Sequence, residues 1–492
     1  MAGLGLAAIA VYRTSASVAD PDLWQQISLF REALALGAVP LRDHFAYTPT
    51  VVPSVHHEWL AGGIAYAIVE SLGGSGIVAL RYALLFGLGA LCWKVNQAQQ
   101  VSFAVFAQSA LLGLLLVDGG FSAVRPQMYA FVLLASLCYG LERDRRGDRR
   151  WLAVWLVLYV AWVNLHGSFA MGAGLFFLHW LEQWLRGAPH RHLLFAGIAM
   201  IPLTLLTPFH VHLLGYLYTA LTIDRPHFAE WTPLFETREP ALIGAYLASL
   251  LLLAYAVAVR GLSLRGVPIV LAAAAWALTS RRMVHLYGVV WLCHVPAYLS
   301  TTPIGAHLRR LWTRRALQLG FWGSALLLFT LALLRAEPWR FRVPGDLDPR
   351  LRQAHMVYPV GAVDYLREQR FEGNLLVGFD WGAYVSWKLH PRVKVSMDSR
   401  FEVAYPPEIE AEQYAFFRGE PGWQNLLDLE RYRATDLILA PRFLASQIHA
   451  KLAELPGWKR VYRDRTFELF AREASRLPLV DRPNVALEGT LP

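Results

Sequence analysis

Two carboxylates separated by one residue begin the first polar segment of the chain. Asp20 and Asp22 flank a proline in Asp20-Pro-Asp-Leu-Trp24, and the proline fixes φ and turns the backbone. Carboxylates at this spacing are able to bind a divalent cation, or one of them is able to accept a proton from an attacking hydroxyl. The structural alternative is a helix-capping turn in an exposed loop.

Imidazoles and a further carboxylate follow these acids in the same polar segment. The segment continues through Arg42-Asp43-His44 to His56-His-Glu-Trp59, and His57 and Glu58 begin the next apolar run. Acids and imidazoles are therefore expected to meet at one membrane surface. We take His57 and Glu58 as candidate substrate-binding neighbours of Asp20 and Asp22.

Basic and amide side chains interrupt three later apolar stretches. Arg125 precedes a proline at the start of one run, where its guanidinium is placed to bind a lipid phosphate or to anchor the helix end. Asn164 and His166 lie within a long apolar stretch, where polar groups are costly and mark either function or a hydrogen bond between helices. Arg281 and Arg282 stand between two apolar runs and predict a phosphate site.

Two motifs in the last third of the chain contain glycine, aromatic and acidic residues at predicted strand ends. They are Gly378-Phe-Asp-Trp-Gly-Ala-Tyr384 and Met397-Asp-Ser-Arg400. Strand ends are where α/β domains place ligands. The alternative is that the glycines and aspartates only form the turns.

The uneven distribution of charged residues predicts the domains that carry these candidate residues. The chain of 492 residues is 55% hydrophobic and 17% charged, and 39 of its charged side chains fall in residues 1–336 against 44 in residues 337–492. This division predicts a transmembrane domain over 1–336, with a first polar loop at 17–56, and a soluble domain over 337–492. The net charge of +9 is concentrated in short clusters between apolar runs, which indicates membrane topology and no nucleic-acid partner.

The apolar runs predict about ten to thirteen membrane helices, since one span needs roughly 17–25 residues. They occupy residues 1–16, 57–72, 76–94, 101–117, 126–141, 151–166, 167–185, 193–206, 241–259, 266–280, 283–300 and 316–335. Four alternate basic loops are expected to be cytoplasmic: Glu142–Arg150, Arg186–His192, Arg260–Arg265 and Arg309–Arg315.

Counting forward from Arg150 places Asn164, His166, Arg281, Arg282 and the soluble tail on the extracytoplasmic side. Counting backward crosses four apolar runs and places the segment 17–56 on the inside, so either one run in 57–141 does not cross or one boundary is wrong. The short stretch His57–Leu72 is the first candidate.

The tail is expected to be a compact α/β domain. Asn374–Phe379, Val393–Met397 and Asp436–Leu439 have the composition of strands, and a helix is predicted at Trp381–Leu389. Alternating strands and helices predict a small parallel or mixed sheet.

The order of the motifs resembles that of one group of proteins. D-P-D-L-W is followed by H-E-W-L, R-P-Q, N-L-H-G, the pair Glu230-Trp231, paired arginines, D-W-G-x-Y and M-D-S-R. This order is similar to that of bacterial polytopic membrane proteins of the GT-C glycosyltransferases, akin to the protein mannosyltransferases and the aminoarabinose and rhizobial lipopolysaccharide sugar transferases. The resemblance covers essentially the whole chain, but Gln25 and Gln26 stand where the group carries tryptophan and histidine, and Thr207-Pro-Phe-His210 replaces N-P-x-G.

The resemblance implies a mainly α polytopic GT-C-like fold with a C-terminal extracytoplasmic α/β domain, in the bacterial cytoplasmic membrane. It implies transfer of a sugar from a polyprenyl-phosphate donor to an envelope glycan, lipid or protein at the outer face. Asp20 or Asp22 is then the catalytic base or a contact to Mg or Mn, and Arg125, Arg281 and Arg282 stabilise the phosphate leaving group. Two alternatives remain: a non-catalytic membrane scaffold with the same fold, and a transporter of a lipid-linked sugar. The protein partners are not predicted.

Overall fold

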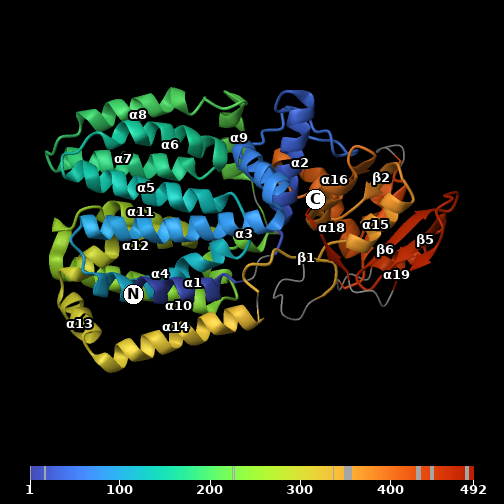
Figure 1. The fold of residues 1–492 in the computed structure, drawn as a ribbon. Coiled ribbons are helices and arrows are strands. Elements are labelled where there is room, and N and C mark those ends of the chain that lie inside the picture. Colours follow the sequence, from blue (N-terminus) through green and yellow to red (C-terminus); the bar gives the residue numbers. More distant parts are fainter. Residues whose placement is uncertain are drawn as a thin grey trace. The chain divides into compact units, whose positions relative to one another are not determined.

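Two compact units make up the chain, whose path is drawn in Figure 1. The computed structural model describes residues 2–15, 18–223, 225, 228–335, 337–347, 357–427, 434–443, 448–482 and 487–491. The helical unit comprises Met1–Ser17, Val78–His210 and Thr222–Arg340, and the α/β unit comprises Val18–Ile77, Val211–Leu221 and Phe341–Pro492. The predicted division into membrane and soluble parts near residue 337 stays a prediction.

The helical unit is built almost entirely from apolar helices. They are α1 (Ala2–Arg13), the second part of α3 (Trp59–Ala98), α4 (Phe103–Val117), α5 (Gln127–Arg145), α6 (Trp151–Leu165), α7 (Phe169–Leu185), α8 (Arg191–Leu203), α10 (Pro240–Arg260), α11 (Val267–Ala277), α12 (Arg281–Ser300), α13 (Pro303–Trp312) and α14 (Arg315–Arg335). Among the described residues, five helices are long and apolar enough to cross a membrane, and several shorter apolar helices accompany them. The protein is therefore a mainly α, multi-pass membrane protein.

Burial separates the central helix of this unit from a peripheral one. The apolar window of α12 is 83% buried, and α12 packs against α4, α5, α10 and α11, whereas the window of α14 is only 11% buried. A helix that is apolar on all sides and enclosed by others is a core helix. Tyr287 and Trp291 of α12 are fully buried and bond to the hydroxyl and the carbonyl of Ser249, so the core of the unit includes a small polar network.

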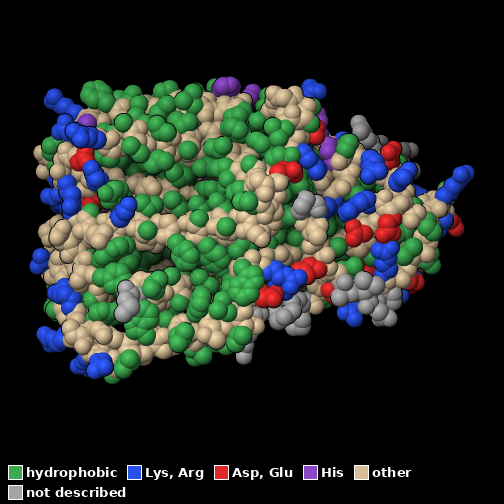
Figure 2. All heavy atoms as spheres, in the orientation of Figure 1, with side chains coloured by type: hydrophobic (Ala, Val, Ile, Leu, Met, Phe, Trp, Pro, Cys, Tyr) green, Lys and Arg blue, Asp and Glu red, His purple; other side chains and the backbone are tan. Residues whose placement is uncertain are grey.

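The predicted basic loops gather at one end of the helical unit. Glu182 near the end of α7 pairs with Arg145 at 3.4 Å and accepts a 2.8 Å hydrogen bond from the backbone of Gly266. The guanidinium of Arg186 donates to the carbonyl of Leu264 at 3.0 Å. Figure 2 has Lys and Arg side chains at the end of this unit that carries α13, while hydrophobic side chains cover the flanks of its helices. This segregation of charge is the pattern that the positive-inside rule describes.

Helix α3 contains the two apolar runs that were expected at residues 57–72 and 76–94. Trp59–Ala98 consists of two helices that meet at a kink, where Gly73 adopts φ 61° and ψ −150°. Only glycine takes up this backbone conformation without steric cost. If the first of these helices does not cross, as expected for His57–Leu72, three crossings separate the segment 17–56 from the basic loop at Arg150. The topology of this region stays a prediction.

The α/β unit combines the first polar segment with the last third of the chain. Its helices are α2 (Pro21–Leu36), the first part of α3, α9 (His212–Thr222), α15 (Val360–Glu368), α16 (Phe379–Leu389), α17 (Phe401–Ala404), α18 (Pro407–Arg418) and α19 (Ile448–Ala453). Its strands are β1 (Val343–Pro344), β2 (Gly373–Leu376), β3 (Val393–Val395), β4 (Leu437–Pro441), β5 (Trp458–Arg463), β6 (Phe467–Arg472), β7 (Val480–Asp481) and β8 (Glu488–Gly489).

Six of these strands form a mixed sheet in the order β3-β2-β4-β6-β5-β7. Strand β2 runs parallel to β3 and β4, and β6 runs antiparallel to β4 and β5. The strands expected in 374–379, 393–397 and 436–439 are confirmed as β2, β3 and β4, and the expected helix is α16. The side chains of β4 are all buried, as a strand covered on both faces requires.

Candidate active site

Asp20 caps the helix that carries Asp22. Helix α2 begins at Pro21, and the Oδ1 atom of Asp20 accepts a 3.0 Å hydrogen bond from the backbone of Asp22. Such a cap satisfies an N–H group that the first turn leaves without a partner in the helix. Asp20 is fully buried, whereas Asp22 is only partly buried in the first turn of α2. The capping function, which was the structural alternative for this motif, applies to Asp20.

Aromatic side chains from the end of the chain fix the position of this turn. Trp24 makes edge contacts with Tyr358 and Tyr384, at ring-centroid distances of 5.7 and 5.1 Å. The hydroxyl of Tyr358 donates to the carbonyl of Ala19 at 3.0 Å. The tyrosine of the D-W-G-x-Y motif therefore packs against the tryptophan of D-P-D-L-W, which explains why the two motifs occur in one chain.

Gln26, one turn after Asp22 on the same face of α2, connects this helix to the start of α3. Its amide donates to Glu58 at 3.0 Å, and the Nε2 atom of His57 lies 3.5 Å from the same carboxylate. His57 stacks on Tyr216 of α9 with centroids 4.6 Å apart. Gln26 is one of the two glutamines that depart from the pattern of the family, and here it positions a candidate acid.

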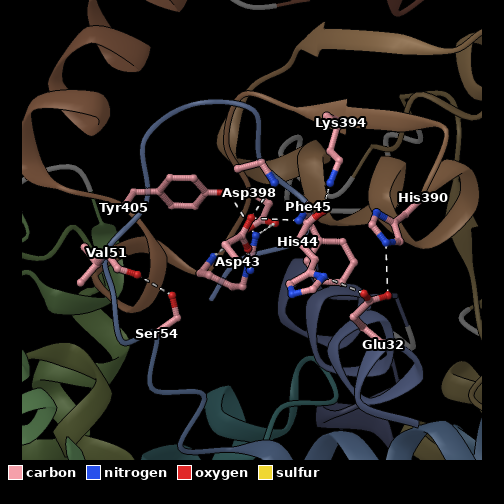
Figure 3. Close-up of polar contacts among 12 residues, drawn as sticks. Glu32, Asp43, His44, Phe45, Val51, Ser54, His390, Lys394, Asp398 and Tyr405 are labelled. Carbon is pink, nitrogen blue, oxygen red and sulfur yellow. Dashed lines mark hydrogen bonds and ion pairs between the residues drawn. The ribbon is translucent and has the colours of Figure 1, made fainter. Parts of the chain in front are cut away.

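The Met397–Arg400 motif forms a buried ionic clasp with the first polar segment. The Arg400 guanidinium donates to Asp398 at 2.7 Å and also pairs with Asp43, and all three side chains are at most 2% exposed (Figure 3). Burial opposes ionisation of Asp43, but Arg400 and the backbone N–H of Ala46 stabilise the carboxylate and lower its pKa. This motif was considered a ligand site or a turn, and its contacts are structural.

A second contact in Figure 3 joins the same segments of the α/β unit. Glu32 of α2 lies 3.0 Å from His44 and 3.2 Å from His390, and the Lys394 ammonium donates to the carbonyl of His44. The first polar segment is therefore held to the sheet domain at the aromatic contacts, the clasp and this carboxylate.

In the helical unit, two arginines from distant segments converge on one carboxylate. Arg125 precedes α5, Arg282 lies in the first turn of α12, and Glu230 belongs to the short 3-10 helix Ala229–Trp231. Glu230 pairs with Arg125 through Oε2, and its Oε1 atom lies 3.2 Å from Arg282. The ring of Trp231 lies beneath the guanidinium of Arg282, 5.6 Å from ring centroid to carbon. We call these charged residues the arginine cluster.

The charges of the arginine cluster act on the carboxylate. Burial raises the pKa of Glu230, but Arg125, Arg282 and Arg281 outweigh this effect and lower the pKa to about 2. Glu230 is thus ionised at neutral pH and neutralises one of its two arginine partners. Counted over the described residues, the cluster retains net positive charge, which is the property needed to hold an anionic headgroup.

His166 extends the arginine cluster toward the end of α6. Its Nε2 atom lies 3.1 Å from the Arg282 guanidinium, and its Nδ1 atom lies 2.8 Å from the hydroxyl of Ser168. The Nδ1 atom also accepts a 3.0 Å hydrogen bond from the backbone N–H of Ser168. His166 therefore links the turn after α6 to Arg282.

Arg281 and Asn164, the other two polar candidates of this unit, have partners of their own. Arg281 pairs with Glu239 at 2.9 Å, and its backbone N–H donates to Thr232. The amide of Asn164 donates to the carbonyls of Val160 and Leu206, at 2.8 and 2.9 Å, and so ties α6 to the end of α8. The contacts of Asn164 match its structural alternative, a hydrogen bond between helices.

The predicted site residues thus form two groups. Asp20, Asp22, His57 and Glu58 belong to the α/β unit, and Arg125, Asn164, His166, Arg281 and Arg282 belong to the helical unit. The sequence analysis included Glu230 only as part of a motif. A carboxylate in a loop of a charge-poor region is a sequence signal that could have identified it as a site residue. Among the described residues, no group of three or more His, Cys, Asp or Glu side chains is placed to hold a metal ion. Within this part of the chain, Asp20 and Asp22 therefore have no third His, Cys, Asp or Glu side chain with which to hold the expected divalent cation.

Comparison with known proteins gives matches at the level of structure. Neither a protein-family model nor a curated protein matches the sequence. The fold is similar to that of the *Archaeoglobus fulgidus* oligosaccharyltransferase, with a TM-score of 0.53, 13% identity, and coverage of 97% of this chain and 75% of the other. It is also similar to ArnT of Cupriavidus metallidurans bound to undecaprenyl phosphate, with a TM-score of 0.52, 13% identity, and coverage of 96% and 97%.

A third similar structure is the arabinofuranosyltransferase AftD from Mycobacteria. The TM-score is 0.54 and the identity 16%, and the match covers 96% of this chain but only 40% of AftD. The chain therefore shares its fold with these three proteins, which agrees with the GT-C-like fold that the order of its motifs implied.

Proposed function

We propose that the protein is a membrane glycosyltransferase that moves a sugar from a polyprenyl-phosphate donor to an acceptor of the cell envelope. The proposal places the reaction at the outer face of the bacterial cytoplasmic membrane, with the basic loops on the cytoplasmic side. The acceptor is a glycan, a lipid or a protein. The three proteins of similar fold are an oligosaccharyltransferase, the arabinofuranosyltransferase AftD and ArnT, and the structure of ArnT contains undecaprenyl phosphate. These similarities support the proposal.

The observation that carries the proposal is the convergence of Arg125 and Arg282 on Glu230. The two guanidiniums approach the two oxygens of one carboxylate, and a phosphate presents oxygens of the same kind in a similar fork. In the proposed mechanism the lipid phosphate replaces Glu230 between the arginines. The same arginines then stabilise the negative charge that develops on the phosphate as it leaves the sugar.

For the catalytic base we propose Asp22. Inverting transfer requires a group that accepts the proton of the acceptor hydroxyl, and that group must come within about 3 Å of it. Asp20 is fully buried and holds the N-terminus of α2, whereas Asp22 is partly exposed on the first turn. Asp20 then positions the helix on which Asp22 lies. No step in this mechanism uses a metal ion.

The proposal is tested first by binding of undecaprenyl phosphate to the full chain in nanodiscs. Replacing Arg125 or Arg282 with glutamine removes a hydrogen bond to a charged group, worth about 1.5–3 kcal/mol, so each variant should bind tenfold or more weakly. Arg310→Gln is the matched control. Arg310 lies in the last turn of α13 and is exposed, so its loss should leave the affinity unchanged.

Transfer is tested with a panel of undecaprenyl-phosphate sugars and an extract of envelope acceptors. Asp22→Asn should reduce release of undecaprenyl phosphate at least 100-fold, because general base catalysis contributes roughly 10²–10⁴ in rate. Its binding of the lipid should not change. Wild-type rates in Asp22→Asn would rule out this base, and wild-type protein that neither binds the lipid nor transfers sugar would favour the scaffold.

A further inference from the structure

A cavity of about 310 Å³ lies on the sheet of the α/β unit, apart from every residue assigned to the transferase. Strand β5 contributes Trp458, Arg460 and Arg463 to its lining, and β6 contributes Glu468 and Phe470. His449 of α19 and Arg442, which follows β4, complete its polar lining together with Lys459. Its volume lies within the range of small-molecule sites, roughly 300–1,000 Å³.

A β-bulge brings two arginines to the same face of the sheet. Side chains three residues apart in a regular strand point to opposite faces. The register between β5 and β6 shifts between Arg460 and Tyr462, so that Arg460 lies opposite Phe470 and Arg463 lies opposite Glu468. Phe470 and Glu468 are two residues apart and share a face, and the bulge therefore places both arginines over the cavity.

Three guanidiniums surround a single carboxylate oxygen there. The Oε1 atom of Glu468 lies 3.7 Å from Arg442, 3.5 Å from Arg460 and 3.5 Å from Arg463. Glu468 is 7% exposed, whereas the three arginine side chains are 24–37% exposed. Asp481 lies 3.8 Å from Arg460 and supplies a second negative charge. Positive charge still exceeds negative charge, and Lys459 adds a further cation.

Donor groups in the cavity are held in place and available. The Arg442 guanidinium donates to the carbonyl of Asp464 at 2.5 Å, which fixes its orientation. The Nε atom of Arg460 and the Nδ1 atom of His449 are buried and have no hydrogen-bond partner within the described part of the chain, whereas the Nε atom of Arg463 faces Glu468. Buried donors of this kind are costly unless a ligand or water satisfies them.

We propose that this cavity binds a phosphate- or carboxylate-bearing sugar. The excess of arginine selects an anion, and the forked guanidiniums match phosphate and carboxylate oxygens. Trp458 provides aromatic surface against which the C–H face of a sugar ring packs, and the guanidinium of Arg472, 4.4 Å over Trp458, fixes that indole. The cavity shares no residue with the proposed transferase site. Experiments are therefore able to contradict the sugar-binding proposal without contradicting the proposed transferase function, and the reverse.

The test is calorimetric titration of the full-length protein in nanodiscs with glucose 6-phosphate, glucuronate, glucose and inorganic phosphate. At least one of the two anionic sugars should bind at least tenfold more tightly than glucose and than inorganic phosphate. Arg460→Gln and Arg463→Gln should each weaken binding of that sugar about tenfold. Glu468→Gln should tighten it several-fold, because it removes the internal carboxylate that competes with the ligand.

The matched control is Arg367→Gln, which removes the same charge from an exposed ion pair with Asp364 on α15. Its affinity for the anionic sugars should equal that of the wild type. Equal binding of glucose, equal binding of inorganic phosphate, or no binding of either anionic sugar to the wild type would overturn the proposal. A weaker affinity in Glu468→Gln with an unchanged melting temperature would overturn it as well, since the carboxylate would then not compete with the ligand.

Discussion

The two units each hold a cluster of arginine and carboxylate side chains, and the two clusters have opposite composition. In the α/β unit one arginine, Arg400, lies between Asp43 and Asp398, and the three side chains are at most 2% exposed. In the helical unit one carboxylate, Glu230, lies between Arg125 and Arg282, and these side chains are 17–30% exposed. The first cluster is closed to water and saturated, whereas the second is accessible and keeps positive charge.

From this difference we propose that the first cluster is a structural ion pair and the second a binding site. Burying charges is costly, and a buried cluster persists only when every partner is present. An accessible cluster with excess charge exchanges its internal partner for a ligand at little cost, because water replaces part of each lost contact. The predictions below test this distinction.

The largest expected effect is the loss of the buried arginine. Arg400→Met leaves the carboxylates of Asp43 and Asp398 without their cation, and removing one partner of a buried ion pair costs about 3–5 kcal/mol. The free energy of unfolding should fall by that amount, as measured by the tryptophan fluorescence of the protein in detergent during thermal unfolding. Arg367→Gln, at an exposed pair, should change it by less than about 1 kcal/mol. Equal effects of the two variants would show that the clasp is not structural.

A tenfold effect of opposite sign is expected at Glu230. Glu230→Gln removes the anion that competes for Arg125 and Arg282, so undecaprenyl phosphate should bind about tenfold more tightly, a gain of about 1.4 kcal/mol. Binding to nanodiscs, detected by native mass spectrometry, measures this change. An unaltered or weaker affinity would mean that Glu230 does not occupy the place of the phosphate.

The hydrogen bond by which Asp20 caps α2 is expected to stabilise the protein. Asp20→Ala should lower stability by about 1 kcal/mol, because the N–H group at the start of α2 loses its acceptor. Asp20→Ser, which restores a capping oxygen, should recover most of this loss in the same unfolding experiment. Failure of serine to restore stability would assign Asp20 a role other than capping.

The smallest effect is the response of the arginine cluster to acid. The folded pKa of Glu230 is about 2 and its ordinary value is 4.5, so its ion pairs stabilise the protein above pH 4.5 and are lost as the pH falls toward 2. Because these side chains are partly exposed, the stability lost should stay below about 1 kcal/mol. The difference in unfolding free energy between wild type and Glu230→Gln, followed from pH 5 to pH 2.5, should shrink. A constant difference would contradict the ionic contribution.

Hydropathy and strand propensity predicted much of the fold. The helix over Trp151–Leu165 and the strands β2, β3 and β4 match the segments expected from sequence. These signals are local, because a single apolar run is enough to predict a membrane helix or a buried strand. Helix α2 was not predicted, because its residues mix polar and apolar types and its start depends on the cap at Asp20.

The pairing of charges could not be predicted in the same way. Asp43 and Arg400 are separated by 357 residues, and Arg125 and Glu230 by 105. Nothing in a single sequence identifies which carboxylate meets which arginine over such distances. The candidate acids and arginines were chosen from their context in the sequence, but the Met397–Arg400 motif was considered a ligand site or a turn, and Glu230 was left out of the site.

The contacts between Trp24, Tyr358 and Tyr384 set an order of assembly. The segment with Asp20 and Asp22 is synthesised first, but the tyrosine that binds the carbonyl of Ala19 follows 339 residues later. At about 5–20 residues per second, roughly 20–70 seconds of synthesis separate the two. During that time the first polar segment lacks these aromatic partners, and Asp43 lacks Arg400. A chain shortened before Tyr358 would leave its first polar segment permanently in this immature state.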